Sequence, residues 1–163
     1  MNLIKWYRVM RFFYCHKMAF ISKIMQGMVF FLYNSKLPGD VKIGKGTYFV
    51  CRGISINLVP GTEIGDNCII GLRFTTARKF PYKNLPVLGN RVWIGPNVVI
   101  TGPVRVGDNV VIAANSVVTK SIPDGCIVGG IPAKIIGYTK DLDYDMFANE
   151  KDREGWAEYM VDK

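Results

Sequence analysis

The chain has 163 residues, 49% hydrophobic and 21% charged, as expected for a globular protein with one sizeable core. Its formal charge of +8 is uneven: residues 1–36 hold six Lys or Arg and no acid, whereas residues 140–163 hold eight acids against four bases. The first bases alternate with apolar residues and match no recognition motif, so a nucleic-acid partner is not expected.

The first segment, residues 1–37, is predicted to form one or two basic amphipathic helices. Aromatic and aliphatic residues alternate there with Lys and Arg, and proline is absent. Two interpretations stay open: packing on the rest of the protein or a partner subunit, and peripheral contact with an anionic membrane. A spanning helix is not expected, because no run of about 18 apolar residues occurs.

An aliphatic residue recurs every six positions through the middle of the chain. The positions are Leu58, Ile64 and Ile70, then Leu88, Ile94, Ile100, Val106, Ile112 and Val118. A period of six fits neither an α-helix nor hairpin strands, but it fits a coil in which each hexapeptide forms one flat side and one corner. Residues 38–138 are therefore predicted to form a parallel β-helix with triangular turns, which is a mainly β fold.

Turn residues mark the corners of this coil and one departure from it. Gly65-Asp66-Asn67 and Gly107-Asp108-Asn109 tolerate the positive φ that corners require. Between about residues 75 and 86 the pattern lapses into a charged, proline-containing stretch, which predicts a loop leaving the coil. Stacked coils need covers at both ends, and the terminal segments are the candidates.

The last segment, residues 139–163, is acidic and is predicted to be a solvated tail or a short helix folding back on the body. Phe147, Trp156 and Tyr159 would supply its apolar contacts.

The four cysteines indicate a reducing, cytoplasmic setting rather than a metal site. Cys15, Cys51, Cys68 and Cys126 lie far apart without a CxxC pair. His16 is the only histidine, so no zinc-ligand spacing is present and no metal is expected.

Four stretches carry a resemblance to a known family. They are PVLGNRVWIGPNVVI from Pro86, VGDNVVIAANSVVTK from Val106, Ile122-Pro-Asp, and GIPAKIIG from Gly130. These residues resemble the hexapeptide-repeat acyltransferases, nearest the serine acetyltransferase branch and the acetyltransferases of polysaccharide biosynthesis. The resemblance covers about residues 38–138 and implies a left-handed parallel β-helix.

The resemblance also implies a homotrimer with acetyl-CoA as co-substrate in the groove between neighbouring coils. The positions that match the pantetheine-lining motif are Gly95, Pro96 and Ala114. Thr119, Lys120 and Lys134 would lie toward the nucleotide, where cations and donors suit phosphates. The implied reaction is acetyl transfer to a hydroxyl or amino group of a small or sugar-linked acceptor.

The family's catalytic base is a histidine in or beside the coil, and this chain has none after His16. Alignment from the upstream repeat puts Cys51 at that position, whereas alignment from Gly53-Ile-Ser-Ile puts Val50 there. Asp66 and Glu63 are further candidate bases. Supply of His16 from the first segment is a second explanation. The third is a catalytically impaired CoA-binding or scaffold homologue, which would bind ligand without turnover.

Overall fold

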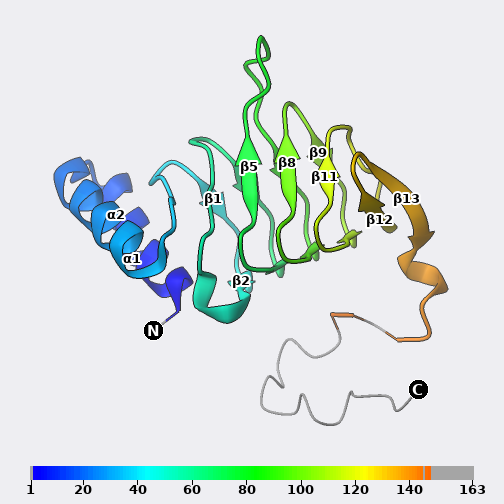
Figure 1. Ribbon diagram of the computed structural model, residues 1–163. Coiled ribbons are helices and arrows are strands. Elements are labelled where there is room, and N and C mark those ends of the chain that lie inside the picture. The colour runs from blue at the N-terminus through cyan, green and yellow to red at the C-terminus, as the bar shows by residue number, and fades with distance from the viewer. Residues whose placement is uncertain (1, 145, 148–163) are drawn as a thin grey trace.

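The computed structural model describes residues 2–144, 146 and 147, and consists of two helices followed by a triangular prism of short strands (Figure 1). The helices are α1 (Leu3–Cys15) and α2 (Ala19–Tyr33). They lie at one end of the prism, and the hairpin of β12 (Cys126–Gly130) and β13 (Ala133–Tyr138) lies at the other (Figure 1).

The strands form three faces, numbered here I to III. Face I contains β1 (Lys42–Ile43), β3 (Glu63–Ile64), β6 (Val87–Leu88) and β9 (Arg105–Val106). Face II contains β2 (Tyr48–Phe49), β4 (Ile69–Ile70), β7 (Trp93–Ile94), β10 (Val111–Ile112), β12 (Cys126–Gly130) and β13 (Ala133–Tyr138). Face III contains β5 (Thr75–Ala77), β8 (Val99–Thr101) and β11 (Val117–Val118). All strand pairs are parallel except β12 with β13.

The six-residue ladder predicted from the sequence forms the core, which confirms the mainly β, left-handed parallel β-helix. All nine aliphatic residues of the ladder are buried. Neighbouring coils are 18 residues apart where the repeat is regular, as between Trp93 and Val111. Each coil therefore contributes one ladder residue per face, and the residues two positions earlier, such as Val92 and Val110, are buried as well, so the stack buries a continuous apolar column.

Two insertions lengthen the regular coil. The 3-10 turn η1 (Val50–Gly53) adds three residues between face II and face III of the first coil, so Lys42 pairs with a residue 21 positions later. The segment between β5 and β6 adds six, so Glu63 pairs with Val87. This second insertion is the loop that rises above the prism in Figure 1.

A ladder of carboxylate and amide side chains closes the corner between faces I and II. The backbone N–H groups of Lys45, Asp66, Asn90 and Asp108 donate to the Oδ1 atoms of Asp66, Asn90, Asp108 and Asp124, at 2.6–2.8 Å. The preceding glycine permits close stacking, because a Cβ on Gly65 would lie 2.3 Å from the Gly89 carbonyl oxygen. These contacts explain the recurring Gly-Asp/Asn motif.

Helix α1 covers the open edge of the first coil, which has no preceding coil to bond with. The buried Tyr7 hydroxyl donates to the Val41 carbonyl at 2.8 Å and accepts from the Ile43 N–H at 3.1 Å. Arg11 donates to the carbonyls of Gly39 and Val41, and Arg8 to those of Ile43 and Gly44. These bonds satisfy backbone groups that would otherwise be exposed at a sheet edge.

The packing interpretation of the first segment is therefore confirmed for α1. At the other end β13 turns back antiparallel on β12, and η2 (Thr139–Asp141) follows it. Most of the predicted C-terminal tail or helix, including Trp156 and Tyr159, lies outside the described residues.

Candidate functional site

The corner between faces II and III forms a continuous column of stacked turns. The N–H of Arg73 donates to Ile54 O, that of Asn97 to Leu72 O, and that of Asn115 to Pro96 O, at 2.9–3.2 Å. The Asn97 amide also donates to the Asn115 amide oxygen at 2.9 Å. We call this the corner column; it joins the first four coils along one edge of the prism.

Three predicted site residues meet on the corner column. Gly95 is buried, Pro96 is half-buried, and Ala114 of the next coil is exposed. A Cβ on Gly95 would lie 2.5 Å from Ala114 N, so only glycine allows the two turns to stack this closely. Small side chains therefore leave the backbone accessible along this edge.

The backbone at Ala114 differs from the equivalent position on the other corner. At the corner of faces I and II, the N–H of Asp108 is taken by the next Asp side chain. Among the described residues, the N–H of Ala114 donates no hydrogen bond. An exposed N–H of this kind suits a carbonyl of an extended amide-containing ligand.

The predicted nucleotide-end residues lie near the C-terminal end of the prism, at both edges of face III. Lys134 is in β13. The N–H of Gly130, at the end of the paired strand β12, donates to Ser116 Oγ at 3.2 Å, which places the β12–β13 hairpin beside the corner column. Thr119 and Lys120 follow β11 at the opposite edge of face III. Both lysines are exposed, and within one chain they flank the face rather than forming one cluster.

Cys51 lies in the first coil, at the N-terminal end of the corner column. It is exposed and has a positive φ of 51°, and the neighbouring Arg52 has a φ of 63°, so the η1 turn projects from the coil. Cys51 is two coils from Gly95, about 10 Å along the axis at the usual strand spacing. The thiol makes no hydrogen bond or ion pair with any described residue.

The other candidate bases lie elsewhere. Glu63 forms an ion pair with Lys42 on face I, at 2.5 Å. Asp66 belongs to the ladder at the corner of faces I and II. His16 is exposed in the turn after α1, where its Nδ1 lies 2.8 Å from the Phe12 carbonyl oxygen. Of the sequence candidates, Cys51 alone shares the corner column with Gly95.

Sequence reasoning included the first coil within residues 38–138 but did not trace the aliphatic ladder back to it, and it missed the Asn97–Asn115 pair. Leu37, Ile43 and Phe49 are buried and already six residues apart, so the ladder could have been extended backward. The nine-residue step from Phe49 to Leu58, caused by η1, hid the connection. The asparagine pair had a signal too, because both residues stand at the same place in consecutive repeats.

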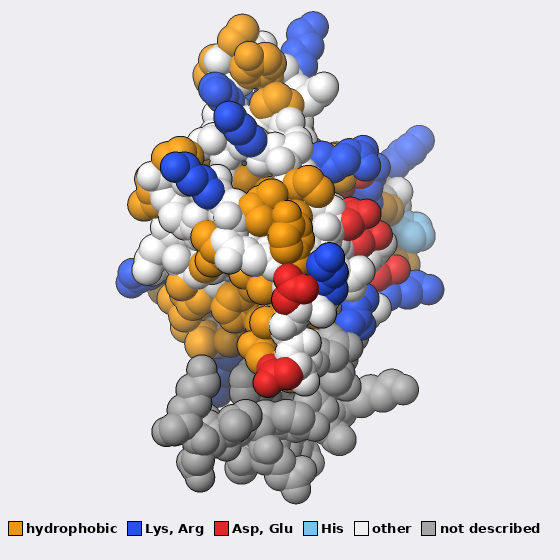
Figure 2. All heavy atoms as spheres, turned by 90° about the vertical axis from the view of Figure 1, so that its right-hand side faces the viewer, with side chains coloured by type: hydrophobic (Ala, Val, Ile, Leu, Met, Phe, Trp, Pro, Cys, Tyr) orange, Lys and Arg blue, Asp and Glu red, His pale blue; other side chains and the backbone are white. Residues whose placement is uncertain are grey.

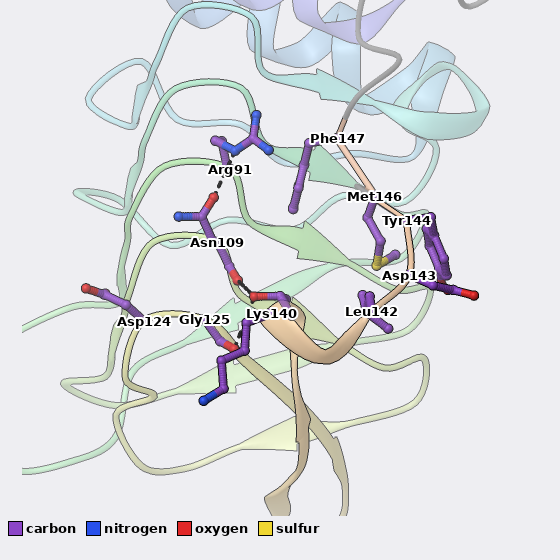
Figure 3. A pocket seen from close by; sticks show the side chains of 11 residues that line it. Arg91, Asn109, Asp124, Gly125, Lys140, Leu142, Asp143, Tyr144, Met146 and Phe147 are labelled. Carbon is purple, nitrogen blue, oxygen red and sulfur yellow. Dashed lines mark hydrogen bonds between the residues drawn. The ribbon is translucent and has the colours of Figure 1, made fainter.

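Two surface hollows lie away from the corner column. The larger, of about 570 Å³, separates the corner of faces I and II from residues 139–144, 146 and 147 (Figure 3). The Arg91 Nε donates to Asn109 Oδ1 at 2.8 Å there, and its guanidinium carbon lies 4.8 Å from the Phe147 ring centroid. The segment after β13 forms one wall of this hollow, and none of the predicted site residues lines it.

The smaller hollow lies between the β5–β6 loop and face I. Its lining includes Lys83, Leu85 and Arg105. Viewed from the β13 end, the loop stands at the top and carries Lys and Arg side chains (Figure 2). Phe80 and Tyr82 of the loop are 88% and 53% exposed.

Comparison with known proteins gives consistent matches over most of the chain. A family model, Bacterial transferase hexapeptide (six repeats), matches residues 86–120. Serine acetyltransferase of Helicobacter pylori is 34% identical over 137 residues, covering 83% of this chain and 78% of the relative. Galactoside O-acetyltransferase of Escherichia coli is 33% identical over 129 residues, covering 71% of this chain and 60% of the relative.

Solved structures share the fold. Serine acetyltransferase from Brucella abortus in complex with coenzyme A superposes with a TM-score of 0.79 at 25% identity, covering 84% of this chain and 55% of that chain. The present chain thus spans about half the length of that enzyme. The stacked hexapeptide turns and the family match define a hexapeptide-repeat protein of the transferase class. Within that class, the chain belongs to the hexapeptide-repeat acetyltransferase family, which includes the serine and galactoside acetyltransferases.

Proposed function

We propose that this protein is an acetyl-CoA-dependent O-acetyltransferase acting on a hydroxyl group, or alternatively an amino group, of a small or sugar-linked acceptor. The corner column carries the proposal: the exposed Ala114 stacks on the buried Gly95 and half-buried Pro96, and its N–H donates no hydrogen bond within the described part of the chain. Family membership supports it, since relatives are serine, galactoside and lipopolysaccharide O-acetyltransferases by name.

The proposed acetyl-CoA site uses the column for the pantetheine arm and the lysines for the phosphates. The N–H of Ala114 would bond an amide carbonyl of the arm, while Pro96 offers an apolar wall. Thr119 and Lys120 stand at the far edge of face III from Lys134. A homotrimer of parallel prisms would bring such opposite edges together across each subunit boundary, giving three sites.

In the proposed reaction, the acceptor oxygen attacks the thioester carbonyl carbon. A C–O bond forms, the C–S bond breaks, and the acceptor proton leaves to a base while CoA departs as the thiol after taking up a proton. The protein's main contribution is to hold thioester and acceptor together and to donate backbone N–H groups to the oxyanion.

Cys51 is the proposed base. The support for this role is its exposed position at the N-terminal end of the corner column. A cysteine accepts a proton only as its thiolate, whereas a neutral imidazole accepts one directly, so turnover should be slow. The second candidate function is a catalytically impaired CoA-binding or scaffold homologue, favoured by the lack of any histidine after His16. The protein would act in the cytoplasm, at the membrane periphery.

The acetyl-CoA site is tested by calorimetric titration of the purified protein and of the double variant Lys120→Glu with Lys134→Glu. Reversing both charges beside the phosphates should weaken binding roughly tenfold or more, with a smaller effect at high salt. Lys45→Glu, an exposed lysine on the corner of faces I and II, is the matched control and should bind like the wild type. Unchanged affinity in the double variant removes these lysines from the site.

A further inference from the structure

Helix α2 is apolar on the side that faces away from the protein. Its buried residues are Ser22, Met25 and Val29, so one of the three inward positions is polar. The outward side chains are large and apolar: Phe20, Ile21, Ile24, Met28, Phe30, Phe31 and Leu32 are 37–88% exposed. A surface helix that packed only on α1 would show polar residues on this side.

At helical spacing these side chains form one broad surface. Phe20, Ile24 and Phe31 lie within about 40° of one another on the helix circumference, with Met28 beside them. We call this surface the α2 outer face. It lies beyond α1 at the end of the prism, so the body of the β-helix does not cover it (Figure 1).

The charges around the α2 outer face are all positive. Lys17 precedes the helix and Lys23 lies on it, and both are exposed. Residues 2–36 contain no acidic residue at all. An apolar helix face rimmed by lysines is complementary to a bilayer surface that bears anionic headgroups, because the apolar side chains enter the acyl boundary while the lysines reach the phosphates.

A second copy of the same face is a poorer occupant. Two α2 outer faces brought together would place Lys17 and Lys23 of both copies at one contact with no acid to neutralise them. Spanning is not an option either: among the described residues, no helix is long and apolar enough to cross a membrane. The observations therefore favour a helix that lies in the plane of the interface.

We propose that the α2 outer face docks the protein onto an anionic lipid surface, with α1 as the spacer between bilayer and β-helix. The docking itself does not depend on catalysis. The membrane affinity does rest on the homotrimer of the proposed function, because a parallel trimer would present three α2 helices on the same side and gain avidity.

The test is co-sedimentation of the full-length protein with vesicles of phosphatidylcholine alone or with about one third phosphatidylglycerol. The wild type should bind the anionic vesicles, bind neutral ones more weakly, and lose binding as salt is raised. Phe20→Ser with Phe31→Ser should reduce binding about tenfold or more by removing the two most exposed aromatic side chains of the helix. Lys17→Glu with Lys23→Glu should reduce binding to anionic vesicles and leave neutral ones unaffected.

The matched control is Phe80→Ser with Tyr82→Ser in the β5–β6 loop, which removes two exposed aromatics elsewhere and should bind like the wild type. All variants change exposed side chains, and retained circular dichroism and acetyl-CoA binding will show that they fold. Docking is overturned if the wild type stays in the supernatant, or if Phe20→Ser with Phe31→Ser binds as well as the control. Self-association lost in that variant without vesicle binding would assign the face to a second copy instead. Acetyl-CoA titration without lipid reports on the proposed function separately.

Discussion

Replacing Tyr7 by Phe should destabilise the protein by about 2 kcal/mol, within the 1–3 kcal/mol expected for a buried unsatisfied group. The hydroxyl is fully buried with the rest of Tyr7 and has two partners on the open edge of the first coil. The Val41 carbonyl would keep its bond from Arg11 Nη1 at 2.7 Å. The Ile43 N–H would lose its acceptor, and that lost bond sets the magnitude.

The assay is thermal unfolding followed by far-ultraviolet circular dichroism at fixed protein concentration. A loss of about 2 kcal/mol corresponds to roughly 4–8 °C in Tm for a chain of this size. Tyr14→Phe is the matched control, because Tyr14 is 43% exposed on the same helix and its hydroxyl makes no hydrogen bond with any residue that the structure describes. If Tyr7→Phe unfolds within about 1 °C of Tyr14→Phe, α1 is not held on the coil edge in the way described.

Three further predictions concern the carboxylate and amide ladder, the buried Tyr7 hydroxyl and Cys51 on the corner column. Asp108→Ala should lower the free energy of urea unfolding by about 1–2 kcal/mol, whereas Asp108→Asn should lower it far less, because Asn90 already accepts the equivalent hydrogen bond one coil earlier. Equal losses would contradict the stabilising role of the carboxylate and amide ladder. Burial raises the pKa of Tyr7 above its ordinary value of 10.0, so the stability that the neutral phenol contributes is present below pH 10 and is lost as pH rises through the folded pKa. Above pH 10 the Tyr7→Phe variant should therefore lose less stability than the wild type, and parallel plots of unfolding free energy against pH for the two proteins would refute this. Cys51→Ser should lower thiol release about tenfold or more with acetyl-CoA affinity unchanged, whereas full activity would remove Cys51 as the base.

The regular part of the coil was predictable because its signal is local. Each hexapeptide repeats one inward aliphatic residue, as at Ile94 and Ile112, and one corner, so the period alone defines the fold. The loop between β5 and β6 was visible for the same reason, since it interrupts the period with proline and charge. Corner motifs such as Gly107-Asp108-Asn109 were recognised from their tolerance of positive φ, as observed at Asn109.

What escaped prediction depends on contacts between distant segments. The roles of Tyr7 and Arg11 as partners of the first coil's carbonyls require α1 to lie across an edge more than 25 residues away in sequence. The placement of Cys51 on the same edge as Gly95 depends on the three extra residues of η1. Two of its positive φ angles fall at Cys51 and Arg52, residue types that do not predict that conformation. Hydrophobic composition likewise could not separate the inward from the outward side of α2.

The most direct test of the proposed activity is a thiol-release assay with the purified full-length protein, acetyl-CoA and a panel of hydroxyl acceptors that includes serine and sugars. We predict slow, acceptor-dependent release of CoA thiol. Acetyl-CoA binding without release for any acceptor would favour a CoA-binding scaffold. Absence of both binding and release would contradict the acyltransferase assignment while leaving the β-helix intact.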